Sequence, residues 1–247
     1  WTFALVEPSL LFLLVLFCIK IRAQSNLVYN GDFELYDTCP TQASYPSLLE
    51  IKKCKGWYPP TLGTSDYFNS CANGINGANG NVWIPNNFIG FQNAYDGNGY
   101  IGLFALEDVN IFPCQYREYI QTKLLAPLEA GKKYTLSYYV SLANYQAAVN
   151  SISALFTNSK IYTTDNCFIK ATPQIKYSGG YLSDTLGWTK VEGSFEALGG
   201  ENYLTLGFFE DTLKHQGVLP LISDTISLGL YSVYYYIDGI YLSEVKI

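Results

Sequence analysis

The chain of 247 residues has little histidine and few charged side chains, and both shortages narrow its chemistry. A single histidine, His215, rules out a zinc site built from several histidines of one chain. A Ser-His-Asp hydrolase would need His215 as its base, but this residue stands in a polar stretch where a solvated side chain is the simpler interpretation. Charged residues make up 15% and the formal net charge is −6, which argues against a nucleic-acid partner and against electrostatic binding to anionic membranes.

Motifs of common catalytic sites are also missing. There is no C-x-x-C pair, no G-x-S-x-G elbow and no phosphate-binding loop. The acidic pairs Glu107-Asp108 and Glu210-Asp211 are sequence neighbours, and neighbours on a strand point to opposite faces. Neither pair forms a two-carboxylate site by itself, although Glu107 with Glu210 across a sandwich stays an alternative. We therefore expect a protein that is not an enzyme.

The start of the chain has the features of an export signal. An apolar block runs from Leu10 to Ile19 and is shorter than the roughly 20 residues of a bilayer-spanning helix. Ala23 then precedes a polar stretch, which predicts a signal peptide over residues 1–23 and one domain over residues 24–247. The alternative is an N-terminal membrane anchor. With the signal removed, we expect a protein that is secreted or held at the outer membrane or cell surface, with no membrane insertion of its own.

Five cysteines follow the expected cleavage site: Cys39, Cys54, Cys71, Cys114 and Cys167. In an exported protein most of them should form disulfides, and an odd number leaves one free or paired to another chain. Their spacing does not fix the connectivity. We predict the pair Cys39–Cys71, which brackets a loop-rich region.

Aromatic residues, by contrast, are abundant at 16%, with 22 Tyr, and Gly occurs 21 times. Strict alternation of apolar and polar residues over 133–143 predicts a half-buried antiparallel strand. Further strands are expected at 26–35, 100–106, 116–125, 151–157, 188–195, 203–209 and 234–245. Residues 36–99 look like loop, and no segment has a helical period of useful length. The pattern predicts an all-β sandwich or barrel in one domain.

Several motifs then point to a family. NLVYNGDFE, LLAPLEAGKKYTLSYYVSLA, GWTKVEGSFEALGGENYLTLGFF and YYYIDGIYLSEV occur in this order and resemble the galactose-binding-like jelly roll of carbohydrate-binding modules. GWYPPTLGTSDYFNSC, IPNNFIGFQNAYDGNGYIGL and REYIQTKL resemble an N-terminal domain of exported Bacteroidota proteins, which often continue into an OmpA-like or type IX secretion sorting domain. The resemblance implies a single jelly-roll β-sandwich with a long, loop-rich N-terminal insertion.

The resemblance also implies a structural calcium ion, which many such modules hold between a Glu on the first strand and an Asp on the last strand, with backbone carbonyls as further ligands. Glu34 and Asp238 occupy the matching places. Calcium takes several oxygen ligands, and two carboxylates from opposite ends of the chain would join the termini. The alternative is that both are solvated or paired to lysine.

Sugar binding needs a flat apolar surface beside hydrogen-bonding groups. The candidates for a glycan or cell-surface ligand are Trp57, Tyr58, Tyr67, Trp83, Gln92, Tyr95, Arg117, Tyr119 and Gln121. For any single aromatic residue a place in the core is the competing interpretation, and Arg117 has a competing role in a salt bridge with Glu118 or Asp66. We expect a non-catalytic, carbohydrate-binding-like module of a secreted or cell-surface protein. The alternative is a structural or adhesive surface protein that engages a protein partner or self-associates without binding sugar.

Overall fold

The computed structural model describes residues 25–75, 77–107, 114, 116–211, 218–219 and 232–246. The expected signal peptide, residues 1–23, and His215 lie outside the described residues. No helix in the described part of the chain has the length and hydropathy needed to span a bilayer. The helical elements described are two short 3-10 turns, η1 (Glu50–Lys53) and η2 (Ser70–Ala72).

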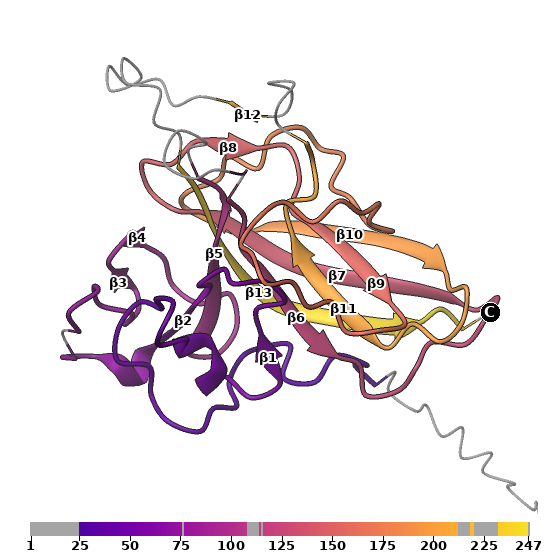
Figure 1. The fold of residues 1–247 in the computed structure, drawn as a ribbon, viewed down its shortest axis with the longest axis horizontal. Helices are drawn as coiled ribbons and strands as arrows, with labels where there is room; N and C mark the ends of the chain where they lie inside the picture. The colour runs from indigo at the N-terminus through magenta and orange to yellow at the C-terminus, as the bar shows by residue number, and fades with distance from the viewer. Residues whose placement is uncertain are drawn as a thin grey trace, which may run out of the picture.

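Two antiparallel sheets form a jelly-roll β-sandwich (Figure 1). The larger sheet has the order β10 (Thr189–Glu196), β7 (Lys133–Leu142), β13 (Val233–Glu244), β5 (Gly99–Leu106) and β2 (Asp66–Asn69). The smaller sheet has the order β1 (Trp57–Tyr58), β6 (Tyr119–Lys123), β11 (Tyr203–Gly207) and β9 (Ser153–Thr157). Two small ribbons pair β12 (Val218–Leu219) with β8 (Ala148–Val149), and β3 (Asn86–Asn87) with β4 (Gly90–Phe91). The all-β sandwich expected from the sequence is confirmed.

The interior between the sheets follows the alternation seen in the sequence. Along β7, Tyr134, Leu136, Tyr138 and Val140 are buried and alternate with more exposed residues. A buried tyrosine also needs a partner for its hydroxyl group. Tyr138 Oη donates to the carbonyl oxygen of Ile152 at 2.6 Å, so this buried hydroxyl has its partner.

The N-terminal segment does not form the strand expected at 26–35, and this expectation is wrong. The backbone of Asn30 (φ 52°) and Phe33 (φ 58°) is left-handed, which no extended strand allows. The segment instead runs beside β13. Asn26 Nδ2 donates to the carbonyl oxygen of Ile240 at 2.8 Å. The backbone amide of Leu27 donates to the carbonyl oxygen of Leu242, also at 2.8 Å. The two ends of the described chain are thereby joined.

The segment before β5 gathers at one end of the sandwich, coloured indigo to purple in Figure 1. It was expected as loop, but it contains β1 to β4 and both 3-10 turns. Part of it packs on the outer face of the larger sheet and forms a second aromatic core with Phe68, Tyr100, Tyr234 and Tyr236. The insertion is therefore a folded layer, because it brings apolar residues of its own to cover the sheet.

Two disulfides link parts of the described chain. Cys39 is joined to Cys71, which is the pair expected from the sequence, and Cys114 is joined to Cys167. Cys54 is a free, buried thiol. Burial raises the pKa of this thiol far above its ordinary value, so it stays protonated and unreactive at neutral pH.

Candidate functional site

Most of the side chains expected to contact sugar lie in the interior. Six of them have relative exposures of 4% or less: Trp57, Tyr67, Gln92, Arg117, Tyr119 and Gln121. Their polar atoms are used within the protein, as when Trp57 Nε1 donates to the carbonyl oxygen of Asn30 at 2.9 Å. In this structure these residues support the surface rather than form it.

Arg117 is a buried residue that contacts the protein interior and not a surface ligand site. Its guanidinium lies 5.2 Å from the ring centroid of Phe208, and Nη1 donates to the carbonyl oxygen of Tyr116 at 3.0 Å. Burial lowers the pKa of Arg117 to about 10. The carboxylates considered as partners have other donors, because Glu118 accepts from Tyr116 Oη at 2.6 Å and Asp66 accepts from Tyr234 Oη at 2.6 Å.

The remaining three candidates are partly or fully exposed and lie in different places. Tyr58 is on β1, at the edge of the smaller sheet. Tyr95 is 45% exposed and stacks on Tyr139 of β7 at 3.5 Å between ring centroids, so it belongs to the larger sheet. Trp83 packs, half-buried, against the second aromatic core. The structure thus brings Tyr58 together with Gln121 but separates this pair from Tyr95.

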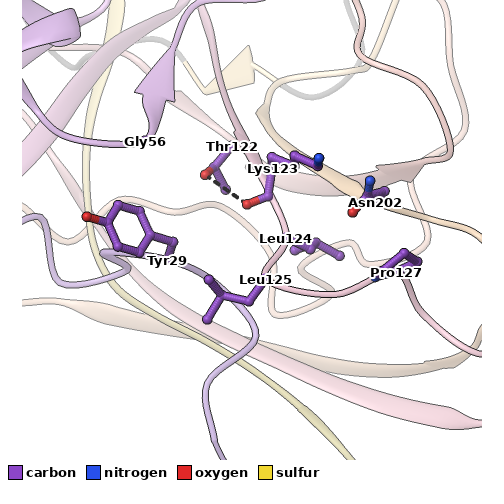
Figure 2. A pocket seen from close by; sticks show the side chains of 8 residues that line it. All are labelled: Tyr29, Gly56, Thr122, Lys123, Leu124, Leu125, Pro127 and Asn202. Carbon is purple, nitrogen blue, oxygen red and sulfur yellow. Dashed lines mark hydrogen bonds between the residues drawn. The ribbon is translucent and has the colours of Figure 1, made fainter.

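A groove runs along the edge where β1 pairs with β6. Two adjoining hollows of about 450 and 730 Å³ share Tyr29, Gly56 and Lys123 in their linings. Figure 2 shows the first hollow, with Tyr29 on one side and Asn202 on the other. We call the two hollows together the β1–β6 groove.

The lining of the groove combines apolar and polar surface. Leu125 is 62% exposed and Tyr29 is 37% exposed, so both offer apolar contact area to a ligand. Lys123 and Asn202 add an ammonium and an amide in the first hollow (Figure 2). This mixture of an aromatic ring with a few polar groups is typical of small-ligand clefts.

Strand pairing positions Tyr58 in the second hollow. Tyr58 is paired with Gln121, and its hydroxyl donates to Gln121 Oε1 at 3.3 Å. Gln121 Nε2 in turn donates to Thr205 Oγ1 at 2.8 Å on β11. Trp57, one residue earlier, points into the core by strand alternation. Buried Gln121 therefore fixes the tyrosine that borders the groove.

Gly56 lets Tyr29 approach the start of β1. Its φ of +85° is a left-handed conformation that favours glycine, and a β-carbon there would lie 2.6 Å from Tyr29 Cδ1. Any larger residue at this position would displace the Tyr29 ring. The shape of the groove thus depends on a glycine that the sequence alone does not distinguish from the others.

Of the two predicted calcium ligands, Glu34 lines a second cleft and Asp238 is buried next to it. Asp238 is fully buried, and its Oδ2 accepts hydrogen bonds from the amides of Tyr95 at 2.9 Å and Asp96 at 3.1 Å. Glu34 Oε1 accepts from the amides of Asn98 at 2.6 Å and Gly99 at 2.8 Å. The two carboxylates, from opposite ends of the chain, thus hold the loop before β5 between them.

The charge at this second cleft is negative. Asp32, Glu34 and Asp96 line a hollow of about 550 Å³. Burial, followed by the charge of Glu34, raises the pKa of Asp238 to about 8, although three backbone amides oppose the shift. Carboxylate oxygens suit a calcium ion, but no three acidic, histidine or cysteine side chains converge on a metal position within the described ranges. Such an ion would need main-chain oxygens as further ligands.

Sequence reasoning missed Tyr29, Lys123 and Lys160 as groove residues. The alternation that places Arg117, Tyr119 and Gln121 on one strand face extends to Lys123, so this residue could have been included. Tyr29 and Lys160 reach the groove only through contacts between distant segments, for which the sequence carries no local signal.

No protein-family model and no curated protein matches the chain. Among solved structures, the CBM22-1 xylan-binding domain of Xyn10C from Paenibacillus barcinonensis is 12% identical, covers 78% of this chain and 88% of that domain, and superposes with a TM-score of 0.39. TmCBM61 in complex with β-1,4-galactotriose is 10% identical over 90% of this chain and 99% of that one, with a TM-score of 0.40. The K1 cleaved adhesin domain of Lys-gingipain from Porphyromonas gingivalis W83 is 14% identical, covers 78% of this chain and 92% of that domain, and superposes with a TM-score of 0.36.

Proposed function

We propose that residues 24–247 form a non-catalytic carbohydrate-binding module of a secreted or cell-surface protein, and that the β1–β6 groove holds the sugar. The observation that carries this proposal is an open groove in which the Tyr29 and Tyr58 rings stand beside amide and ammonium groups. An aromatic ring packs against the C–H face of a pyranose, while the polar groups bind its hydroxyls. The sequence resemblance to carbohydrate-binding modules favours the same function.

Two further features support an exported protein without a catalytic role. Disulfides persist in oxidising compartments, so Cys39–Cys71 and Cys114–Cys167 suit an exported protein. Glu210, the acid considered for a catalytic pair with Glu107, forms an ion pair with Lys176 and is engaged structurally. Membership of an exported Bacteroidota protein stays a prediction from the sequence.

We also propose that calcium binds between Glu34 and Asp238 and stabilises the module. Both carboxylates contact the loop that precedes β5, and the adjoining cleft is lined by Glu34 together with Asp32 and Asp96. When bound, the ion would neutralise this charge and hold the two chain ends at one loop. Its role would be structural, because the cleft is distinct from the β1–β6 groove.

The proposal predicts that Tyr29→Ala or Tyr58→Ala weakens glycan binding by about tenfold, since truncating an aromatic ligand contact costs more than about 1 kcal/mol. The glycan is first found on an array with the purified wild-type chain, and affinities are then measured by titration calorimetry. Tyr241→Ala is the matched control, because Tyr241 is 40% exposed, close to the 37% of Tyr29, but lines the acidic cleft.

Each outcome of this comparison has a clear meaning. Loss of affinity in the Tyr29 and Tyr58 variants alone supports the groove. Loss in the Tyr241 variant alone would place the sugar on the larger sheet and contradict the groove. If no glycan binds the folded wild-type chain, while it self-associates or captures a protein, the structural or adhesive alternative is correct.

A further inference from the structure

The second hollow of the β1–β6 groove has an unusual charge for this protein. The whole chain has a formal net charge of −6. The hollow nevertheless is lined by four lysines and a single acid: Lys52, Lys55, Lys123, Lys160 and Asp37. A local positive charge on an acidic chain attracts ligands that the net charge would repel.

Within the part of the chain that the structure describes, three of these four ammonium groups have no carboxylate partner. Lys55 Nζ lies 3.2 Å from Asp37 Oδ1. Among the described residues, no ion pair involves Lys52, Lys123 or Lys160. Each of the three is exposed, so its charge is available to a ligand in the hollow.

Lys160 is positioned by the fold rather than left on a free loop. The amide of the next residue, Ile161, donates to Gln121 Oε1 at 3.2 Å, which ties the loop after β9 to β6. The same loop pairs with the chain after β1, since the amide of Thr163 donates to the carbonyl oxygen of Pro60 at 3.0 Å. As a result Lys160 Nζ lies 4.0 Å from the ring centroid of Tyr58.

The aromatic and cationic groups therefore share one surface. Tyr58 borders the hollow beside Lys160, and Tyr29 and Lys123 connect it to the first hollow. An ammonium group binds a carboxylate or sulfate strongly because the hydrogen bond is charge-assisted. An aromatic ring next to it takes the apolar face of a sugar. A neutral glycan uses only the second of these features, whereas an acidic glycan uses both.

We infer that the β1–β6 groove selects anionic glycans, whose uronate carboxylates or sulfate groups bind Lys123 and Lys160. This inference rests on the proposed function and specifies its ligand class. The lysines confer the preference for charge, Tyr29 contacts the sugar ring, and Tyr58 holds Lys160 in place by a cation–π contact. Lys52 and Lys55, which also line the second hollow, add long-range attraction that salt screens.

The test uses two matched pairs of polysaccharides: polygalacturonate against its methyl ester, and dextran sulfate against dextran. Binding to the full chain is measured at low and at physiological salt. The double variant Lys123→Gln/Lys160→Gln should lose about tenfold or more in affinity for a charged probe, because two charge-assisted contacts are removed. The double variant Lys133→Gln/Lys170→Gln removes the same charge from exposed positions outside the groove lining and should retain the affinity.

The outcomes separate this inference from the proposed function. Binding of charged probes that weakens with salt and depends on Lys123 and Lys160 supports it. Equal loss in both double variants would show attraction by overall charge and overturn it. A third outcome is that the neutral probes bind as tightly as the charged ones and that the lysine substitutions have no effect. This would overturn the preference for anionic glycans while the carbohydrate-binding function stands. Absence of binding to all four probes, with a glycan array also negative, would overturn both.

Discussion

Replacement of Asn30 by alanine is expected to lower the free energy of unfolding by about 3 kcal/mol, because roughly three buried hydrogen bonds are lost together. Asn30 Nδ2 donates to the carbonyl oxygens of Leu35 at 2.9 Å and Lys55 at 3.0 Å, and Oδ1 accepts from the amide of Leu35 at 2.8 Å. The side chain is only 7% exposed, so water cannot replace these bonds easily. The measurement is urea denaturation with an unchanged m-value.

Asn30→Gly is the informative control. Asn30 has φ 52°, a conformation that costs alanine about 1 kcal/mol but costs glycine little. The glycine variant should therefore lose the same hydrogen bonds and yet be more stable than the alanine variant by about that amount. A loss below about 0.5 kcal/mol in the alanine variant would be ordinary for a surface site and would contradict the role of Asn30 as the link between the N-terminal segment and Lys55, which lines the β1–β6 groove.

The second large effect concerns pH and Asp238. Its pKa is raised from 3.8 to about 8, chiefly by burial, so the folded state holds this proton more strongly than the unfolded state does. Between pH 4 and pH 8 the unfolded state is the one that has released the proton, and stability must therefore fall as pH rises. Without calcium, the slope due to this group approaches about 1.4 kcal/mol per pH unit at most and vanishes outside the interval.

Asp238→Asn removes the titration of this carboxyl group, so its effect can be separated from that of the other titrating groups. Burial also raises the pKa values of Asp66 and Glu118, and these groups remain in both proteins. The quantity to compare is thus the difference in unfolding free energy between wild type and variant, measured by denaturation from pH 4 to pH 9 in EDTA. A difference that does not change with pH would contradict the shifted pKa.

Calcium should reverse the trend in the wild type. The ion binds the ionised carboxylate, so added calcium should raise the melting temperature more at pH 8 than at pH 5. Glu34→Gln and Asp238→Asn should each abolish most of this increase. An equal increase in the wild type and both variants would place any calcium elsewhere.

Local patterns in the sequence were sufficient to predict the regular strands. The alternation at 133–143 became β7 over Lys133–Leu142, and the expected strand at 234–245 became β13 over Val233–Glu244. In β7 one face is buried, so period-two patterning was a reliable signal, whereas β13 is buried on both faces over most of its length and shows no strict alternation. The N-terminal segment failed this reasoning because Asn30 and Phe33 adopt left-handed backbone. Both residues are bound by distant segments, since Asn30 Nδ2 donates to the carbonyl oxygen of Lys55 and Tyr67 Oη donates to that of Phe33.

The ligand candidates were harder to predict for a different physical reason. In a chain with 22 Tyr, aromatic rings form the core as well as the surface, and composition does not distinguish the two. Tyr67 is fully buried, and its hydroxyl donates to the carbonyl oxygen of Phe33 at 2.8 Å, a partner 34 residues away. Tyr29 lies at the groove through a contact with Gly56, which is also distant in the sequence. Both placements depend on tertiary packing, which spacing along the chain does not encode.

The most direct test of the central claim is to map a bound oligosaccharide by NMR, using a fragment of the best ligand from the array and amide chemical shifts of the isotope-labelled chain. If the sugar binds the β1–β6 groove, the largest shift changes will be at Tyr29, Gly56, Tyr58 and Lys123, with little change at Tyr95 and Tyr241. Changes confined to Tyr95, Tyr139 and Tyr241 would show that sugar binds the larger sheet and would contradict the assignment of the groove.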